Sequence, residues 1–463
     1  MLRYISRCNL FIAPGAILSK SQYTALVEEV ADAIAAGTLK AGERLPPQRI
    51  FAYEKGIAAS TAGRVYSELL RRGLVVGEVG RGTFVAGRNL TPSIVRGVPQ
   101  EGRIDLEFNF PTVPAQAELL AKSLAGLQRA AALADALGPL TQRRLTTARG
   151  VSASFLATAH WRPDPDSFVF SGSGRQSIAA AISAVVPVGG RLAVEAVTYP
   201  MIRSIAARLG VGIVPIPTDA EGLRPDAIAR AHRSGAISAV YVQPVLQNPL
   251  GHTMSPARRQ ELLRLADKLN LVIIEDLVYG FLADDPPLAA QAPERCLAID
   301  SLSKRLAPGV AVGFIVAPKP LQDRLATVVR AGTWSVTPLA LDVAARAMAD
   351  GTAAEIVRLK RIDARERQRI VSTGLAGHQL AADPRTYHAW LTLPDHWSSD
   401  AFVAAAGRRG VAVTPGRAFA MTPTHAPNAV RLALGLPRHD ELAVAVQRLR
   451  ALVESHDEAD VTE

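Results

Sequence analysis

Cysteine and long apolar runs are scarce in this sequence. The only cysteines among 463 residues are Cys8 and Cys296, so a disulfide framework is excluded and a reducing, cytoplasmic location is expected. The most apolar run, residues 271–282, has two carboxylates in its middle and falls short of the roughly 18 apolar residues that a membrane helix needs. Residues 1–19 lack a continuous hydrophobic region, so we expect an N-terminal arm and not a signal peptide. We expect no membrane partner.

Acidic residues are also in the minority. The chain has 52 Lys and Arg residues against 42 Asp and Glu residues, a net charge of +10. Residues 1–88 contain 12 of the basic and 7 of the acidic residues, so less than a fifth of the chain carries half of the excess positive charge. This concentration favours a module that binds a polyanion such as nucleic acid. Because 48% of the residues are hydrophobic and 20% are charged, global disorder is excluded.

The first part of the chain has the order helix, helix, helix, hairpin. Apolar residues with helical spacing define one face of a first helix: Tyr23, Val27, Val30 and Ile34. Pro46 and Pro47 suit the opening of a short second helix, and a third helix begins at Ser60. Two β-rich runs around a Gly-rich turn then predict a hairpin over residues 74–85. This order is that of a winged helix-turn-helix, which we place at residues 20–87.

A different pattern begins after residues 88–103, which contain prolines and glycines without periodicity and are expected to form a linker. From residue 104 on, short apolar runs alternate with helical stretches. The expected strands cover residues 168–170, 191–195, 213–216, 238–243, 271–276, 296–300 and 312–316. Such alternation predicts a mostly parallel sheet covered by helices on both faces. Further β-rich runs at 387–393 and 411–414 indicate a smaller α+β subdomain, so we place a second domain at residues 104–463.

Four polar segments follow the expected strands, at the ends where α/β proteins place their sites. They are Ser171-Gly172-Ser173-Gly174-Arg175-Gln176, Asn248-Pro249-Leu250-Gly251, Asp276, and Ser301-Leu302-Ser303-Lys304. A glycine-containing helix start can bind phosphate, and a carboxylate that ends so apolar a strand needs a cationic partner. Each segment has a plain alternative, because such turns are often ordinary loops and a buried Asp or Lys is often half of a structural ion pair. Together they suggest pyridoxal 5′-phosphate (PLP), which uses a lysine, an acid for its ring nitrogen and a phosphate site.

Three motifs in this half follow one another in a fixed order: Asn-Pro-x-Gly at Asn248, Asp-x-x-Tyr at Asp276 and Ser-x-Ser-Lys at Ser301. On these motifs, residues 104–455 resemble the fold-type I (class I/II) aminotransferases. Residues 20–87 resemble the GntR winged-helix domain, through Leu45-Pro46-Pro47-Gln48-Arg49 and the wing Gly80-Arg81-Gly82-Thr83-Phe84. The combination resembles the MocR family of transcriptional regulators. The resemblance implies an N-terminal winged helix-turn-helix followed by an α/β, fold-type I, PLP-dependent aminotransferase-like domain, with a mostly parallel sheet and a smaller α+β subdomain.

The resemblance to the aminotransferases implies a role for each matching residue. Lys304 would form the Schiff base with PLP and, together with Asp276, would carry any catalysis. Asp276 would pair with the pyridine nitrogen, and Asn248 and Tyr279 would bond to the phenolic oxygen of the ring. Tyr199 matches the aromatic residue that stacks on the ring, although a tyrosine packed in the core is an equal alternative.

The phosphate and carboxylate ends of the site are implied in the same way. Residues on the phosphate side are Ser173, Gly174, Arg175, Ser301 and Ser303. Arg431 matches the arginine that binds the α-carboxylate of amino-acid ligands, a task that suits bidentate geometry; a surface salt bridge is the alternative. The chain departs from the family at Ala311, where an arginine usually contacts the phosphate. Arg175 or Arg305 could substitute for it, and we expect weaker PLP retention. No metal ligands are expected.

The resemblance to the GntR domain implies a set of DNA-contacting residues. They are Arg49, Ser60, Thr61, Arg64, Arg81 and Gly82. Ser60, Thr61 and Arg64 are the candidates that face the major groove, and Arg81 and Gly82 belong to the wing. The recognition helix usually starts with an arginine that is missing from Ala58-Ala59-Ser60-Thr61, which removes one expected base contact. A single exposed arginine is usually a solvated surface residue, but the ordered set favours DNA binding.

The leading hypothesis is a PLP-dependent transcriptional regulator. It would bind a double-stranded DNA operator and sense PLP or an amino compound, such as an amino acid, through its aminotransferase-like domain. The alternative is an active aminotransferase that carries a winged-helix domain, because the residues implied for catalysis are complete. A structural protein with a dead site ranks last, since Lys304 and Asp276 are both present. The family builds its sites at a dimer interface, so a homodimer is expected.

Overall fold

The computed structural model describes residues 20–36, 38–39, 43–71, 74–78, 82–85, 102–422 and 426–455. The chain divides into two units, Met1–Thr91 and Pro92–Glu463. The predicted N-terminal arm, most of the predicted linker and Arg81 lie outside the described residues, so the predicted domain bounds stay predictions. Among the described helices, none is both long and apolar enough to cross a membrane.

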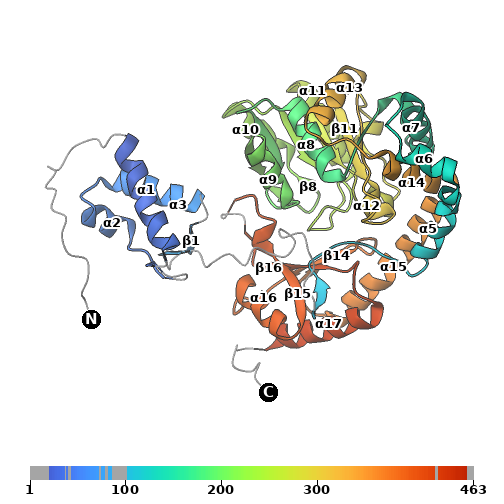
Figure 1. Cartoon of the computed structure of the whole chain (residues 1–463). Coiled ribbons are helices and arrows are strands. Elements are labelled where there is room, and N and C mark those ends of the chain that lie inside the picture. Colours follow the sequence, from blue (N-terminus) through green and yellow to red (C-terminus); the bar gives the residue numbers. More distant parts are fainter. Residues whose placement is uncertain are drawn as a thin grey trace. The chain divides into compact units, whose positions relative to one another are not determined.

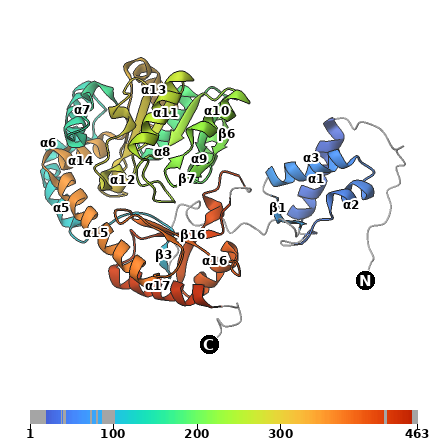
Figure 2. The ribbon, with the colours of Figure 1, turned by 180° about the vertical axis from the view of Figure 1, so that it is seen from behind.

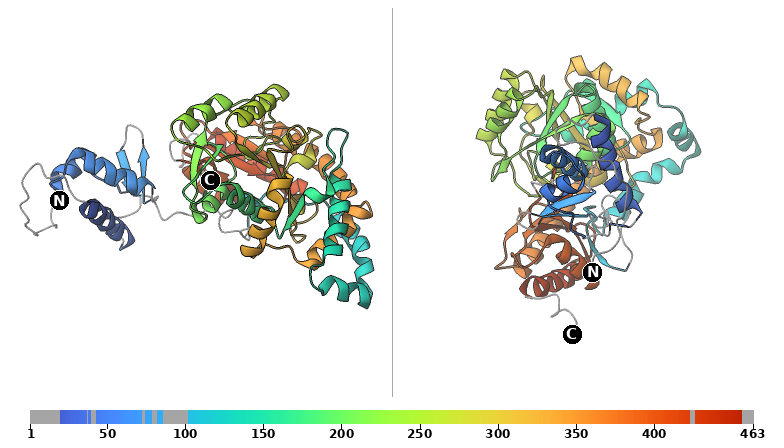
Figure 3. Two further views of the ribbon diagram at one scale, coloured as in Figure 1. Left: turned by 90° about the horizontal axis from the view of Figure 1, so that it is seen from above. Right: turned by 90° about the vertical axis from the view of Figure 1, so that its left-hand side faces the viewer.

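The first unit consists of helices and a hairpin in the predicted order (Figure 1, blue). Its elements are α1 (Lys20–Ala35), α2 (Gln48–Glu54), α3 (Ala59–Arg71), β1 (Val75–Glu78) and β2 (Gly82–Val85). Tyr66 of α3 ties the helices together, because its ring meets Phe51 edge-on at 5.3 Å and its hydroxyl donates to the carbonyl of Pro46 at 2.5 Å. β1 and β2 pair antiparallel beside the helices (Figure 3). The predicted winged helix-turn-helix is confirmed, with α3 beginning at Ala59 and not at Ser60.

The larger sheet of the second unit has the strand order β4-β12-β11-β10-β9-β5-β6. Its strands are β4 (Phe168–Ser171), β5 (Arg191–Glu195), β6 (Gly212–Ile216), β9 (Ala239–Val242), β10 (Val272–Asp276), β11 (Cys296–Ser301) and β12 (Gly313–Val316). Neighbours from β6 to β11 pair parallel, whereas β12 pairs antiparallel with both β11 and β4. Each strand agrees with a predicted run to within one residue at either end. The predicted mostly parallel sheet is confirmed.

Helices cover both faces of this sheet, as the pattern predicts (Figures 1 and 2). Tyr241 of β9 packs in a core with α8 (Gly174–Val185), α9 (Met201–Arg208) and α13 (Lys319–Ala331). Val240 and Val242 of the same strand pack on the opposite face with α7 (Gln142–Leu156), α10 (Pro225–Arg233), α11 (Pro256–Lys268) and α14 (Pro338–Ala349). Strands that are buried on both faces need apolar residues at every position, which explains the continuous apolar runs.

The smaller sheet has the strand order β13-β14-β16-β15-β3. Its elements are β3 (Ile104–Leu106), β13 (Leu380–Ala381), β14 (His388–Thr392), β15 (Val411–Pro415) and β16 (Ala429–Ala433), with α16 (Ser399–Arg408) and α17 (His439–Glu454) packed against them. β14 and β15 confirm the predicted runs at 387–393 and 411–414. β3 was not predicted as a strand; it pairs parallel with β15 at the sheet edge and leads the chain into residues 107–111.

Helix α15 (Thr352–Gly374) belongs to both parts of this unit and lies between them in both views (Figures 1 and 2). Near its start, Ala353 and Ile356 belong to the core of the larger sheet. Near its end, Val371 belongs to the core of the smaller sheet, where α15 packs against α17. A single helix therefore connects the two cores.

Candidate cofactor site

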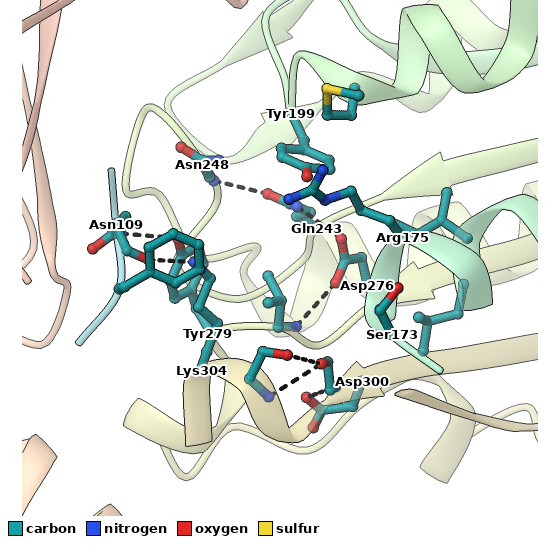
Figure 4. Close-up of a pocket in the computed structure, with 18 of the residues that line it drawn as sticks. Asn109, Ser173, Arg175, Tyr199, Gln243, Asn248, Asp276, Tyr279, Asp300 and Lys304 are labelled. Carbon is teal, nitrogen blue, oxygen red and sulfur yellow. Dashed lines mark hydrogen bonds between the residues drawn. The ribbon is translucent and has the colours of Figure 1, made fainter. Parts of the chain in front are cut away.

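A cavity of about 520 Å³ lies at the carboxyl ends of the parallel strands (Figure 4). All of the residues predicted to hold PLP or its ligand line this cavity: Ser173, Gly174, Arg175, Tyr199, Asn248, Asp276, Tyr279, Ser301, Ser303, Lys304 and Arg431. Most of them follow β4, β5, β9, β10 or β11, whereas Arg431 comes from β16 of the smaller sheet. The fold brings the whole set together, and the role of each residue in it stays a prediction.

Lys304 lies on the short helix α12 (Leu302–Arg305), directly after β11. Ser301 caps this helix, because its Oγ accepts a hydrogen bond from the backbone N–H of Ser303 at 3.2 Å. Nζ of Lys304 donates to the carbonyl oxygen of Asn109 and lies 3.8 Å from the centre of the Phe110 ring. The segment after β3 therefore covers the amine (Figure 4).

The surroundings of Lys304 favour its neutral form. Burial of the amine lowers the pKa of Lys304 well below its usual value, and the nearby charges of Arg431 and Arg175 lower it further. The neutral amine is the nucleophilic form of a lysine. The Lys304 amine is therefore favoured in the form that reacts with an aldehyde.

Asp276 ends β10 with a buried carboxylate that accepts three hydrogen bonds. Its Oδ2 accepts from the hydroxyl of Tyr241 at 2.6 Å and from Nε2 of Gln243 at 3.0 Å, and its Oδ1 accepts from the N–H of Val278 at 3.0 Å. Burial raises the pKa of Asp276 despite these hydrogen bonds. All three donors are neutral, and within the described residues Asp276 forms no ion pair. Its negative charge is therefore available to a cationic atom of a ligand, such as a protonated pyridine nitrogen.

Tyr279 and Asn248 both line the cavity. The hydroxyl of Tyr279 accepts from Nδ2 of Asn109 at 2.8 Å. Burial raises the pKa of Tyr279 to about 12, so this phenol keeps a proton that it can donate to a ligand oxygen. Oδ1 of Asn248 accepts from Nη1 of Arg431 at 3.4 Å, which leaves the amide nitrogen of Asn248 as a further donor.

Arg431 is buried, with 1% of its surface exposed, and it forms none of the salt bridges found among the described residues. Its Nη2 donates to the carbonyl of Glu107, and its guanidinium lies 5.0 Å from the centre of the Phe419 ring. Within the part of the chain that the structure describes, Nε of Arg431 has no hydrogen-bond partner. A buried guanidinium that is paired with a carbonyl and an amide has capacity left for a carboxylate.

The phosphate end lies where α8 begins. Ser173 caps α8 by accepting from the N–H of Gln176 at 3.3 Å, and a Cβ added to Gly174 would lie 3.0 Å from the Cβ of Ser301. The glycine thus allows the helix start and the Ser301 side chain to approach closely. Such a helix start with adjacent hydroxyls is suited to a phosphate. Ala311 also lines this cavity, so the departure from the family's arginine falls inside the site.

The position of Tyr199 is compatible with both expectations, and stacking on the PLP ring stays a prediction. It lines the cavity and also packs against the core on the α8 side of the larger sheet. Burial raises the pKa of Tyr199 to about 12, which the charge of Arg175 partly offsets. In the close-up the Arg175 side chain extends toward this ring (Figure 4).

Some residues of the cavity were not predicted. They are Phe108, Asn109, Phe110, Gln243 and Asp300, with Tyr241 behind Asp276. Gln243 and Asp300 end predicted strands, so the rule that sites lie at strand ends would have found both. No pattern signals Asn109, because the three residues of β3 are too short to have a recognisable period.

The predicted DNA-contacting residues lie on one small unit, except that Arg81 is outside the described residues. Arg49 on α2 and Ser60 and Arg64 on α3 are exposed, and Thr61 is half-buried. The guanidinium of Arg64 lies 4.8 Å from the centre of the Tyr23 ring of α1. Gly82 begins β2 with φ +122°, and the Arg44 side chain lies 2.7 Å from where a Cβ would be. Their contacts with DNA stay predictions.

Comparisons with known families cover both units. Residues 104–449 match the family described as aminotransferase class I and II, and residues 22–85 match the bacterial regulatory proteins of the gntR family. Among solved structures, an archaeal alanine:glyoxylate aminotransferase superimposes with a TM-score of 0.70 at 22% identity, over 78% of this chain and 92% of that chain. LysN, an α-aminoadipate aminotransferase from Thermus thermophilus, gives a TM-score of 0.70 at 20% identity, over 79% of this chain and 95% of its own. These likenesses establish the aminotransferase fold.

Relatives in sequence span nearly the whole chain. The HTH-type transcriptional regulator YdeF of Bacillus subtilis is 26% identical over 94% of this chain and 95% of its own length. The vitamin B6 salvage pathway transcriptional repressor PtsJ of Salmonella typhimurium is 27% identical over 86% of this chain and 92% of its own. The pyridoxine biosynthesis transcriptional regulator PdxR of Corynebacterium glutamicum is 26% identical over 66% of this chain and 68% of its own. The chain therefore belongs to the MocR-type transcriptional regulators, in which a GntR-type helix-turn-helix region is fused to a class I and II aminotransferase domain.

Proposed function

We propose that the aminotransferase-like domain of this regulator binds PLP and that its occupancy, by PLP alone or with an amino compound, changes the affinity of the winged helices for a double-stranded DNA operator. The names of PtsJ and PdxR connect two relatives with vitamin B6. The cavity offers the chemistry that PLP requires: an amine, a buried acid, a phenol and a helix start for the phosphate. The functional form would be a homodimer that presents two winged helices to two half-sites.

Each end of the cavity would hold one part of the cofactor. When bound, PLP supplies an aldehyde that combines with amines and a pyridine ring that withdraws electrons. Lys304 would bond to the aldehyde carbon, and Asp276 would hold a proton on the ring nitrogen. Tyr279 and Asn248 would donate to the phenolic oxygen, and Ser173, Ser301 and the start of α8 would bind the phosphate. Arg431 would bind the carboxylate of an amino-acid ligand.

One arrangement supports regulation in particular. The two groups that would bind ligand, the Lys304 amine and the Arg431 guanidinium, both donate to backbone carbonyls of one segment, those of Asn109 and Glu107. This segment follows β3, and β3 follows the part of the chain that connects to the DNA-binding unit. A ligand that takes over either donor competes with the segment for it. Ligand occupancy would thus change how firmly the start of the second unit is held.

The test is operator affinity, measured by fluorescence anisotropy with apo protein, with PLP, and with PLP plus a panel of amino acids. A regulator requires unequal ligand affinity for two conformations, and a coupling of about 1–3 kcal/mol changes operator affinity about 5- to 150-fold. Arg431→Ala should abolish the response to amino acids and keep the response to PLP. If operator affinity never changes, regulation by this site is refuted.

An active aminotransferase is the second candidate. The observation in its favour is that an amine, an acid, a phenol and a buried arginine all face one cavity, as turnover requires. Steady transfer of an amino group from one amino acid to a keto acid, without any change in operator affinity, would support the enzyme over the ligand-controlled regulator.

A further inference from the structure

A buried lysine outside the cavity contacts the backbone of the helix that carries Lys304. Lys360 lies on α15, is 0% exposed and is absent from the cavity lining. Its Nζ donates to the carbonyl of Lys304 at 2.9 Å and to the carbonyl of Leu306 at 2.7 Å. No part of the site described above makes use of this side chain.

The two carbonyls need a donor from outside their own helix. The last carbonyls of any helix lack partners within it, and α12 has only four residues. The chain turns away at Leu306, which has φ −102° and ψ −85°, so the helix cannot continue to satisfy them. A buried carbonyl without a partner is costly. Lys360 supplies both missing hydrogen bonds from a neighbouring helix.

A charged lysine is energetically costly to bury at this position. Burial lowers the pKa of Lys360 to about 7, and the charge of Asp363 offsets this only in part. Asp363 itself is engaged elsewhere, since its oxygens accept from Arg367 at 2.6 Å, from Tyr387 at 2.8 Å and contact His439 at 2.8 Å. A neutral donor could bond the same carbonyls without the cost of burying a charge. A lysine at this position supplies both the two hydrogen bonds and a positive charge close to Lys304.

We infer that Lys360 is a positioning residue for Lys304: it fixes the backbone from which the Lys304 side chain reaches the cavity and places a positive charge behind the Lys304 amine. Two observations support this. The hydrogen bonds at 2.9 and 2.7 Å hold the carbonyl of Lys304 itself and that of Leu306, two residues further along the chain. Lys360 is also among the charges that lower the pKa of Lys304, after burial, Arg431 and Arg175.

The consequence concerns the capture of PLP, so this inference rests on the proposed cofactor. With PLP bound, the neutral Lys304 amine would add to the aldehyde carbon. A carbon–nitrogen double bond would form, and the aldehyde oxygen would leave as water with both hydrogens of the amine. The rate of PLP capture depends on the fraction of Lys304 that is neutral and on the position of its amine relative to the aldehyde carbon. A misplacement of about 1 Å costs up to about 100-fold in rate.

The experiment compares Lys360→Met and Lys360→Gln with the parent in the full chain. PLP capture is followed by stopped-flow absorbance over a range of pH, and the bond to Lys304 is verified by borohydride trapping and mass spectrometry. Met removes donor and charge, whereas Gln keeps a neutral donor. Lys122→Met, at an exposed lysine paired with Glu118, is the matched control, and thermal unfolding monitors stability.

Lys360→Met should capture PLP about 10- to 100-fold more slowly at neutral pH. In both variants the midpoint of the pH–rate profile should move to higher pH, because the positive charge that Lys360 carries below its pKa of about 7 is gone. If Lys360→Met does not fold, the profile of Lys360→Gln decides. Parental rates and profiles with only a lower unfolding temperature would mean a purely structural lysine and would overturn the inference. Failure of the parent itself to capture PLP would instead refute the proposed function.

Discussion

Arg305 donates from both Nε and Nη2 to one carboxylate oxygen of Asp300, at 2.8 and 2.5 Å. Asp300 is 2% exposed and immediately precedes Ser301 in the cavity wall. The pair is electrically neutral as a whole, so Arg305 cannot replace the positive charge that is missing at Ala311. Arg175 is exposed at the same end of the cavity and, among the described residues, forms no ion pair. Of the two substitutes considered from the sequence, the geometry favours Arg175.

The first prediction therefore concerns Arg175. A charge-assisted hydrogen bond to phosphate contributes about 1.5–3 kcal/mol, so Arg175→Ala should weaken PLP binding about 10- to 100-fold. Equilibrium titration followed by absorbance measures this, with Arg330→Ala as an exposed control on α13. Ala311→Arg should improve retention on dialysis. An Arg175→Ala protein with parental affinity would contradict the assignment.

The second prediction concerns the lysine itself. The parent should be yellow when loaded with PLP, and borohydride should trap the cofactor on Lys304. Lys304→Ala should lose the trapped adduct while the other residues of the cavity still bind PLP weakly. Mass spectrometry of the reduced protein checks this. A colourless parent that ignores added PLP would exclude the cofactor.

The third prediction tests the segment after β3. The side chain of Asn109 holds this segment to Tyr279 through a 2.8 Å hydrogen bond. Asn109→Ala removes this hydrogen bond, which contributes about 0.5–1.5 kcal/mol. The operator affinity of the apo variant should therefore move about 2- to 10-fold toward that of the PLP-bound parent. Hydrogen exchange of residues 102–111 should accelerate in parallel.

Thr112→Ala is the control for this variant, because Thr112 contacts Gly435 and does not line the cavity. If Asn109→Ala loosens the segment but operator affinity stays parental with and without PLP, the segment does not transmit occupancy.

The fourth prediction concerns acid stability. Burial lowers the pKa of His388 to about 3, below its usual value near 6.5. Between these two values the unfolded chain binds a proton that the folded chain does not, so the free energy of unfolding falls as the pH drops from about 6.5 to about 3. One such proton contributes about 1.4 kcal/mol per pH unit.

His388→Asn should reduce the change of the free energy of unfolding with pH between about pH 6.5 and 3. His160→Asn, at an exposed histidine, should not. Urea unfolding at a series of pH values measures the difference. Because the His388 ring lies 5.3 Å from that of Tyr279, PLP absorbance should be recorded on the same samples. Equal slopes for parent and His388→Asn would show that another group dominates acid unfolding.

The fifth prediction concerns DNA. Binding to a mapped operator should be weakened by each of the substitutions Arg49→Ala, Arg64→Ala and Arg81→Ala. Loss of a phosphate contact should also lower, by about one, the steepness with which the logarithm of the binding constant falls with the logarithm of the salt concentration. Because Arg64 stacks on Tyr23, thermal unfolding of Arg64→Ala must accompany its binding data. Parental binding by all three variants would show that other residues contact the DNA.

The parallel strands could be predicted to within one residue because burial on both faces demands apolar residues at every position. The four polar segments at strand ends could be predicted for a related reason: polar residues that end such strands meet at one sheet edge. Tyr199, Tyr279 and Arg431 were predicted only from the resemblance to the aminotransferases. β3 and Asn109 could not be predicted in this way. Three residues have no period, and β3 is a strand only because β15, far along the chain, lies beside it.

The sequence by itself determined the two kinds of domain, the strands of the larger sheet and a set of polar residues that all line the cavity. Only the tertiary structure decided how those residues are engaged: Arg305 with Asp300, Arg431 with the carbonyl of Glu107, and Lys360 with the helix that carries Lys304. The physical reason is that local patterns report the burial of single elements. Hydrogen bonds and ion pairs depend on distances between groups on different elements, and these distances exist only once the cores have packed.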